Sequence, residues 1–147
     1  EKRLVELGFK PAWLPDGSGF VATFVKENKH WMSVFDTSGT ELSTILFYGK
    51  DYCSYMGNVD VSPDGQKIAF EMITQNHGRV SIYTVNLDGT GLRLLTPVGG
   101  ESPTWSPDGS MLSYAFAEGF IDRSDPLINH KIWIMNADGF EKRPLTY

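Results

Sequence analysis

The stretch ESPTWSPDG, residues 101–109, decides the fold because its ending occurs three times in the chain. Two earlier stretches match it: NVDVSPDG at residues 58–65 and PAWLPDG at residues 11–17. The three Pro-Asp-Gly prolines are separated by 48 and 44 residues, and a glycine that ends DTSG, NLDG or NADG recurs every 50 residues. A repeat of this length predicts a propeller or a solenoid.

Apolar side chains alternate with other residues around these landmarks, which indicates β-strands rather than helices. The second copy shows the alternation at Ile68, Phe70 and Met72. Its stretch IYTVN, residues 82–86, is rich in the β-branched and aromatic residues that strands prefer. The first and third copies repeat both features. Each copy therefore predicts four short antiparallel strands, which we name a, b, c and d in chain order.

The Pro-Asp-Gly triplet is typical of a tight turn between strands a and b. Proline presets φ, aspartate hydrogen-bonds the local backbone, and glycine accepts a positive φ. We therefore assign a structural role, and not a catalytic one, to nine turn residues: Pro15, Asp16, Gly17, Pro63, Asp64, Gly65, Pro107, Asp108 and Gly109.

The motifs WSPDG, IYTVNLDG, IWIMNADG and RLLT together resemble the repeats of TolB-like β-propellers. The resemblance covers the whole chain, and it implies an all-β fold: a β-propeller segment of about three four-stranded antiparallel blades. The first copy departs from the pattern, since Leu14 stands where the others have Ser62 and Ser106. The implied organisation is a single domain, residues 1–147, with strand d of a preceding blade at 1–8 and blades at 9–48, 57–97 and 101–147.

Three blades do not close a ring, because propellers typically need about 4–8 blades around a channel. The first and last sheets would each leave an apolar face exposed, and such faces promote association. Two alternatives stay open at this point. The segment is part of a larger propeller, or a homodimer completes a propeller, which would then have six blades.

Composition narrows the classes of partner. The net charge is −5, and no run of Lys or Arg occurs, which predicts no nucleic-acid binding. No apolar run approaches the roughly 20 residues of a transmembrane helix. The single cysteine, Cys53, excludes an internal disulfide and leaves the compartment open. The resemblance implies a cell-envelope location, while similar blades also serve in the cytoplasm.

In propellers of the TolB type the d–a and b–c connections gather on one face, where the resemblance places partners and ligands. The d–a segment FYGKDYCSYMGN, residues 47–58, is enriched in Tyr and Met, as interface cores are. The alternative is that these rings only cover the end of a blade. The candidate binding residues are Tyr48, Lys50, Asp51, Tyr52, Tyr55 and Met56.

The segment AEGFIDRSDPLINH, residues 117–130, joins strands b and c of the third copy and is longer than an ordinary hairpin loop. Long loops on a rigid scaffold often carry recognition, although a neutral insertion is the alternative. Its candidate binding residues are Phe120, Asp122, Arg123 and Asp125.

One histidine precedes strand c in each copy: His30, His77 and His130. Three imidazoles can hold Zn²⁺, and some TolB-like lyases that act on pectin fragments use a histidine-bound metal. Equivalent points on adjacent blades, however, should be on the order of 15 Å apart, while metal–nitrogen bonds are about 2.0–2.1 Å. We therefore expect three independent surface histidines, no metal site and no cofactor.

No Gly-x-Ser-x-Gly elbow, phosphate loop or dinucleotide fingerprint occurs in the sequence, and no catalytic residue is assigned. The leading interpretation is a non-enzymatic β-propeller scaffold that binds protein or peptide through its d–a and b–c loop face. The alternative is the propeller portion of an enzyme, either a peptidase accessory domain or a metal-dependent polysaccharide lyase.

Overall fold

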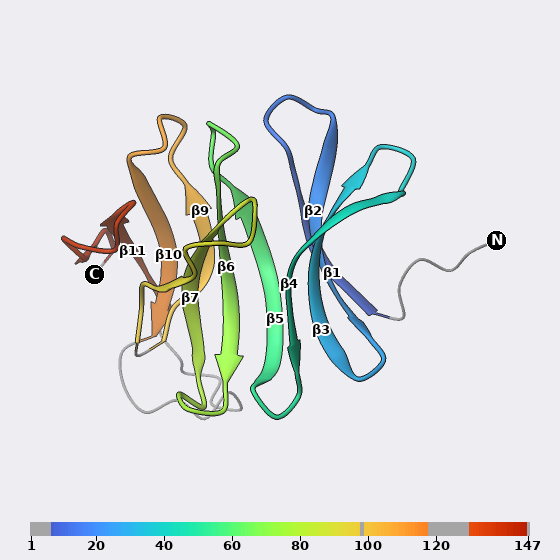
Figure 1. Cartoon of the computed structure of the whole chain (residues 1–147). Coiled ribbons are helices and arrows are strands. Elements are labelled where there is room, and N and C mark those ends of the chain that lie inside the picture. Colours follow the sequence, from blue (N-terminus) through green and yellow to red (C-terminus); the bar gives the residue numbers. More distant parts are fainter. Residues whose placement is uncertain (1–6, 98, 118–129, 147) are drawn as a thin grey trace.

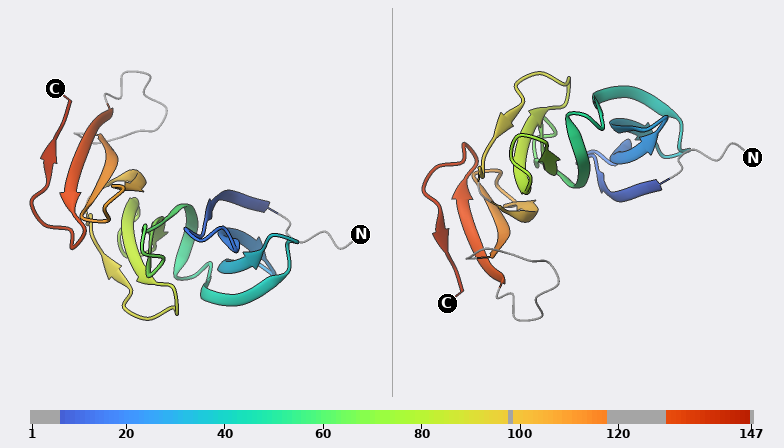
Figure 2. Two further views of the ribbon diagram at one scale, coloured as in Figure 1. Left: turned by 90° about the horizontal axis from the view of Figure 1, so that it is seen from above. Right: turned by 90° about the horizontal axis from the view of Figure 1, so that it is seen from below.

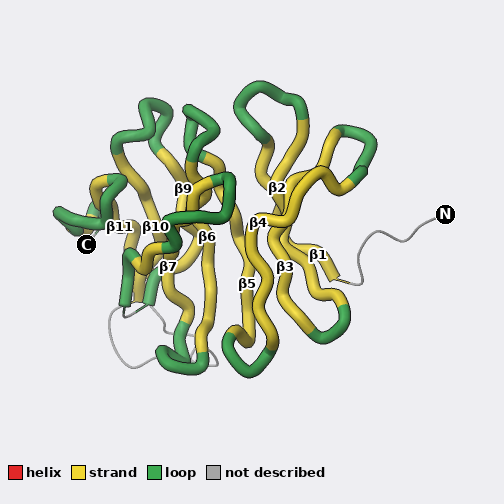
Figure 3. Tube along the Cα trace, viewed as in Figure 1, coloured by secondary structure: helices red, strands yellow, loops and turns green. Residues whose placement is uncertain are grey.

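The computed structural model describes residues 7–97, 99–117 and 130–146, and these residues form three four-stranded antiparallel sheets (Figure 1). Strands follow one another in chain order within each sheet, and each pairs antiparallel with the next strand of its sheet. Figure 3 shows strands and loops only, and no helix that could cross a bilayer occurs in the described part of the chain. The predicted all-β fold of three four-stranded sheets is confirmed.

Each sheet supplies strands a to d of one blade. Sheet A consists of β1 (Leu7–Trp13), β2 (Gly19–Lys26), β3 (Lys29–Asp36) and β4 (Glu41–Gly49). Sheet B consists of β5 (Cys53–Val61), β6 (Lys67–Thr74), β7 (Val80–Asn86) and β8 (Arg93–Leu94). Sheet C consists of β9 (Glu101–Trp105), β10 (Met111–Ala117), β11 (His130–Asn136) and β12 (Arg143–Pro144).

The sheets stand side by side in the order A, B, C, so that only sheet B has a neighbour on both sides (Figure 2). One apolar cluster joins sheets A and B and includes Met32, Met56 and Phe70, all fully buried. A second cluster joins sheets B and C and includes Ile82 and Leu112, also fully buried. The apolar core of the chain therefore lies between sheets rather than within one.

The Pro-Asp-Gly segments form the a–b turns. Gly17, Gly65 and Gly109 have φ of 72°, 71° and 71°, the left-handed region that glycine enters without strain. In the third turn Asp108 Oδ1 accepts hydrogen bonds from Ser106 Oγ at 2.6 Å and from the Ser110 backbone N–H at 3.0 Å. The aspartate thus holds the backbone of the turn from its own side chain.

In the second and third turns, the serine before the proline adds a hydrogen bond across the turn. Ser62 Oγ accepts the N–H of Lys67 at 2.9 Å, and Ser106 Oγ accepts the N–H of Met111 at 3.0 Å. Leu14 has no such acceptor in the first turn, and its side chain packs against the cluster between sheets A and B instead. The departure of the first copy from the repeat is therefore an exchange of a turn hydrogen bond for apolar packing.

The connections lie at two opposite ends of the sheets (Figure 1). The a–b turns that follow β1, β5 and β9 lie at one end, which we call the turn face. The links β2–β3, β4–β5 and β6–β7 lie at the other end, which we call the loop-rich face. The β8–β9 connection meets β9 at this same end, because β9 finishes at the turn face.

Two predicted boundaries differ from the structure. Leu7 and Gly8 pair with Val25 and Phe24 of β2, so they open strand a of sheet A, while residues 1–6 lie outside the described residues. The predicted loop at residues 47–58 is mostly strand, because β4 continues to Gly49 and β5 begins at Cys53. Blade 2 therefore begins before residue 57, and the true connection is a short turn at residues 50–52.

Acidification should weaken the a–b turns. Hydrogen bonds from Ser106 and Ser110 lower the pKa of Asp108 from 3.8 to about 2. Because the folded pKa is the lower one, this carboxylate stabilises the fold above about pH 4, and that contribution disappears as the pH falls toward 2. We expect Asp108→Asn to lower the melting temperature at pH 7 and to flatten its fall between pH 4 and pH 2.

The measurement is thermal unfolding followed by circular dichroism across this pH range. Asp51→Asn, in the exposed turn at residues 50–52, is the matched control and should follow the parent protein. An Asp108→Asn variant whose melting temperature tracks the parent at every pH would show that the turn carboxylate does not contribute.

Candidate functional site

Four of the predicted binding residues lie together on the loop-rich face. Tyr48 lies next to the last residue of β4, and its ring lies 4.8 Å from the ring of Tyr52 between centroids. Tyr52 is 44% exposed, and Lys50 and Asp51 between the two tyrosines are exposed as well. Tyr48 also packs against the cluster between sheets A and B. The pair thus presents one anchored and one accessible ring.

Met56 is not a binding residue, and this prediction is wrong. Its side chain is fully buried in the cluster between sheets A and B. Residues 53–61 form a strand that mixes buried and more exposed positions, so the composition of the segment does not describe one exposed surface.

Tyr55 is half-buried, and its side chain points toward Glu71 of the neighbouring strand β6 rather than into solvent. Its hydroxyl donates a hydrogen bond to Glu71 Oε2 at 3.1 Å. A Cβ atom at Gly57 would come within 2.4 Å of that hydroxyl, so glycine at this position leaves room for the tyrosine. Tyr55 is therefore a positioning residue in the network around Glu71.

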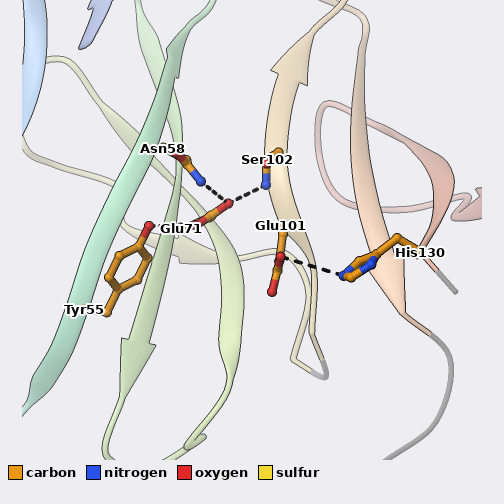
Figure 4. A network of polar contacts seen from close by, with 6 residues as sticks. All are labelled: Tyr55, Asn58, Glu71, Glu101, Ser102 and His130. Carbon is orange, nitrogen blue, oxygen red and sulfur yellow. Dashed lines mark hydrogen bonds and ion pairs between the residues drawn. The ribbon is translucent and has the colours of Figure 1, made fainter. Parts of the chain in front are cut away.

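Glu71 in β6 is the centre of a polar network between sheets B and C (Figure 4). Its side chain is 3% exposed. Oε1 accepts hydrogen bonds from Asn58 Nδ2 at 2.7 Å and from the backbone N–H of Ser102 at 2.5 Å. The last bond joins β6 to the first strand of the next sheet. A buried carboxylate without such donors would cost several kcal/mol, so the network fixes the relative position of the two sheets.

A second carboxylate bridges the same two sheets. Asp60 Oδ2 in β5 accepts the backbone N–H of Trp105 in β9 at 2.7 Å. Burial raises the pKa of Asp60, while the hydrogen bond from Trp105 opposes that shift. Ala12 is the residue of sheet A equivalent to Asp60 of sheet B. The contact between sheets A and B therefore forms without such a carboxylate bridge.

Removing the Glu71 carboxylate should loosen the contact between sheets B and C. Glu71→Ala leaves the Ser102 N–H and the Asn58 amide without their acceptor, and we expect the free energy of unfolding to fall by about 3 kcal/mol. Glu71→Gln keeps an oxygen at the Oε1 position and should cost about 1 kcal/mol or less. Urea denaturation measures both values.

Glu41→Ala in the exposed part of β4 is the control, and it should leave the stability close to that of the parent. Equal losses for Glu71→Ala and Glu41→Ala would contradict the structural role of the buried network.

The three histidines do not form one class. His77 and His130 are exposed, as predicted. His30 is 5% exposed, which corrects the expectation of a surface residue, and burial together with the charge of Lys50 lowers its pKa. His30 is the second residue of β3 and pairs with Tyr48 of β4.

His130 has an acidic neighbour instead of another histidine. Its Nε2 lies 4.0 Å from Glu101 Oε2, and both side chains are more than a third exposed, so the pair contributes little to stability. Within residues 7–97, 99–117 and 130–146 no three His, Cys, Asp or Glu side chains gather into a metal-binding group. Phe120, Asp122, Arg123 and Asp125 lie outside the described residues.

A cavity of about 200 Å³ lies between sheets B and C beside the β8–β9 connection. Its lining is almost wholly apolar and includes three aromatic rings, from Tyr114, Phe116 and Trp133. Trp133 stacks edge-to-face on Phe116 at 5.4 Å between ring centroids. The remaining lining residues are Thr96, Pro97, Gly99 and Lys142.

A comparison with the contact between sheets A and B explains this cavity. There Leu46 at the sheet edge is part of the apolar cluster that holds Met72 and Tyr83. Thr96 takes the corresponding place at the edge of sheet B, and its Oγ1 accepts the N–H of Ile82 at 2.8 Å. The smaller threonine leaves the aromatic rings of sheet C uncovered. The sequence shows this only when the two copies are aligned at the strand edges.

Truncation of Met56 should destabilise the fold far more than truncation of Tyr52. Met56→Ala empties a buried site and should lower the free energy of unfolding by about 2–5 kcal/mol. Tyr52→Ala removes an exposed ring and should cost about 1 kcal/mol or less. Urea denaturation of the two variants, side by side, checks the assignment. Similar losses for both would mean that Tyr52 belongs to the core.

Comparisons with known proteins place the fold. Neither a protein-family model nor a curated protein matches the sequence. A protein assigned as TolB from Agrobacterium tumefaciens matches 95% of this chain with 49% of its own length, at 22% identity and a TM-score of 0.74. A chain of the nidogen–laminin complex matches 95% of this chain with 48% of its own length, at 18% identity and a TM-score of 0.68.

An enzyme shares the same architecture. An oligogalacturonate lyase in complex with manganese matches 91% of this chain with 39% of its own length, at 17% identity and a TM-score of 0.64. The chain therefore spans half or less of the solved structures that it resembles. Its three stacked sheets have the fold of a TolB-like β-propeller segment.

Proposed function

We propose that this chain is a binding scaffold without a catalytic centre of its own, and that it holds a protein or peptide at its loop-rich face. The observation that carries the proposal is the aromatic cavity beside the β8–β9 connection. At about 200 Å³ it is smaller than the roughly 300–1,000 Å³ of small-molecule sites, so it suits a single inserted side chain.

The lining of the cavity selects the chemistry of that side chain. Rings of Tyr114, Phe116 and Trp133 offer apolar faces, and burial raises the pKa of Tyr114 to about 12, so its hydroxyl stays neutral. A charged group would lose its hydration there, and Lys142, the one charged residue in the described lining, already donates to the Gly139 carbonyl. We therefore propose an apolar or aromatic anchor residue in the partner.

The tyrosine pair at the β4–β5 turn supplies a second contact. Tyr52 is accessible and is supported from behind by Tyr48. Lys50 and Asp51 beside it provide charges of both signs for specificity. Aromatic anchors with a polar rim are the usual composition of protein-binding sites.

Selection of a random peptide library on the immobilised protein tests the proposal. We expect enriched peptides to share an apolar or aromatic position, and their dissociation constants to rise at least tenfold in Phe116→Ala. Phe140→Ala removes the same ring from an exposed site in the β11–β12 turn and should change binding less than twofold.

Melting curves of both variants separate lost binding from lost folding. Enriched peptides that bind the two variants equally would contradict the cavity as the binding site. Turnover of oligogalacturonate in the presence of manganese would contradict a purely binding role and favour the enzymatic alternative.

A further inference from the structure

The two contacts between sheets follow one pattern along the chain. The face of sheet A that packs on sheet B is aliphatic and includes Val21, Met32 and Val34. The facing residues of sheet B are bulkier and include Phe70 and Tyr83. The face of sheet B that packs on sheet C contains the smaller residues Ala69, Ile82 and Leu95. The facing residues of sheet C include the rings of Trp105 and Tyr114, together with Leu112 and Met135. In both contacts an aliphatic face meets a bulkier, ring-bearing face of the next sheet.

Among the side chains that the structure describes, six aromatic rings lie on the outer face of sheet A. Consecutive pairs lie 5.0–6.4 Å apart between centroids and connect β1 to β4 without a break. None of these rings belongs to the cluster between sheets A and B. Trp13 and Phe47, at the two ends of the ladder, are 65% and 55% exposed, while Phe24 and Phe35 inside it are buried. The ladder consists of Trp13, Phe20, Phe24, Trp31, Phe35 and Phe47.

The outer face of sheet C carries aliphatic side chains, in contrast to the aromatic outer face of sheet A. Ile132 and Leu145 are 42% and 49% exposed, and they occupy the positions that Ile82 and Leu95 hold in sheet B. The Leu145 N–H donates to the Ile132 carbonyl at 2.7 Å, just as the Leu95 N–H donates to the Ile82 carbonyl at 2.8 Å. Ile82 and Leu95 are the residues that sheet B uses against sheet C.

Two other positions of this outer face lack the carboxylates of sheet B, although Glu101, which pairs with Ala115 and lies 4.0 Å from His130, also stands on it. Ala115 stands where sheet B has Glu71, and Thr104 stands where it has Asp60. At these two positions a large aromatic face can therefore approach sheet C without burying a carboxylate, as in the contact between sheets A and B, where the corresponding residues are Thr23 and Ala12.

We propose that the outer face of sheet A binds the outer face of sheet C in a second copy of this chain. The two open faces are the two halves of the contact that the chain already makes twice. Such a contact is heterologous, and a closed pair of copies contains it twice, which gives a ring of six sheets. This inference concerns the sides of the sheets and is independent of binding at the loop-rich face.

Light scattering coupled to size-exclusion chromatography measures the assembly directly. We expect twice the 16.4 kDa mass of the chain, independent of concentration in the micromolar range. A monomer would overturn the proposal in favour of a different occupant of these faces. A mass that grows with concentration would overturn the closed pair, because an unclosed head-to-tail contact forms filaments.

Two variants test which faces meet. Phe47→Glu on sheet A and Ile132→Glu on sheet C should each weaken dimerisation at least tenfold, while both proteins keep the parent circular dichroism spectrum. Leu92→Glu introduces the same charge at an exposed leucine in the β7–β8 connection and should leave the dimer intact. Loss of the dimer in only one of the two variants would indicate a contact between like faces and would contradict the head-to-tail arrangement.

Mixing the two variants distinguishes loss of a specific contact from general damage to the fold. Each variant retains one intact face, so a mixed pair contains one unaltered contact. We expect energy transfer between differently labelled Phe47→Glu and Ile132→Glu proteins at concentrations where neither self-associates. Absence of this transfer would overturn the proposed pairing of sheet A with sheet C.

Discussion

An aliphatic sheet face packed against a ring-bearing face of the next sheet is the contact on which the rest of this structure depends. A four-stranded sheet has two faces, and no helix covers either of them in the described part of the chain. The fully buried Phe70, Met72 and Ile82 all lie in clusters shared by two sheets. A repeat of this kind cannot bury its apolar faces alone, so neighbouring blades stabilise one another.

The two contacts differ in their polar reinforcement. Between sheets B and C, Glu71 and Asp60 hold backbone N–H groups of β9 in addition to the apolar packing. Between sheets A and B, the residues at the same positions cannot supply a carboxylate, and Leu46 fills the edge of the contact instead. The first arrangement fixes register and leaves a cavity, while the second maximises buried apolar area. The candidate binding site thus lies where packing is incomplete and the geometry is held by hydrogen bonds.

The periodic features were predictable from the sequence because they are local. The Pro-Asp-Gly turns and the alternating strands depend on neighbours within a few residues, and the three sheets follow from them. The composition of the 47–58 segment predicts one interface, and that prediction is wrong for Met56 because Met56 is buried while Tyr52 is exposed. Glu71 was missed, yet a single acid within IAFEMIT is a signal of a buried network. The burial of His30 and the cavity at Thr96 depend on contacts between segments far apart in the sequence.

The most direct test of face-to-face packing is a nuclear Overhauser measurement on the methyl groups of Ile82. These methyl groups lie on the face of sheet B that the structure packs against sheet C. The account predicts cross-peaks from Ile82 to aromatic protons of sheet C, those of Trp105 and Tyr114 among them. Cross-peaks confined to residues of sheet B would contradict it, since the sheets would then not pack on one another.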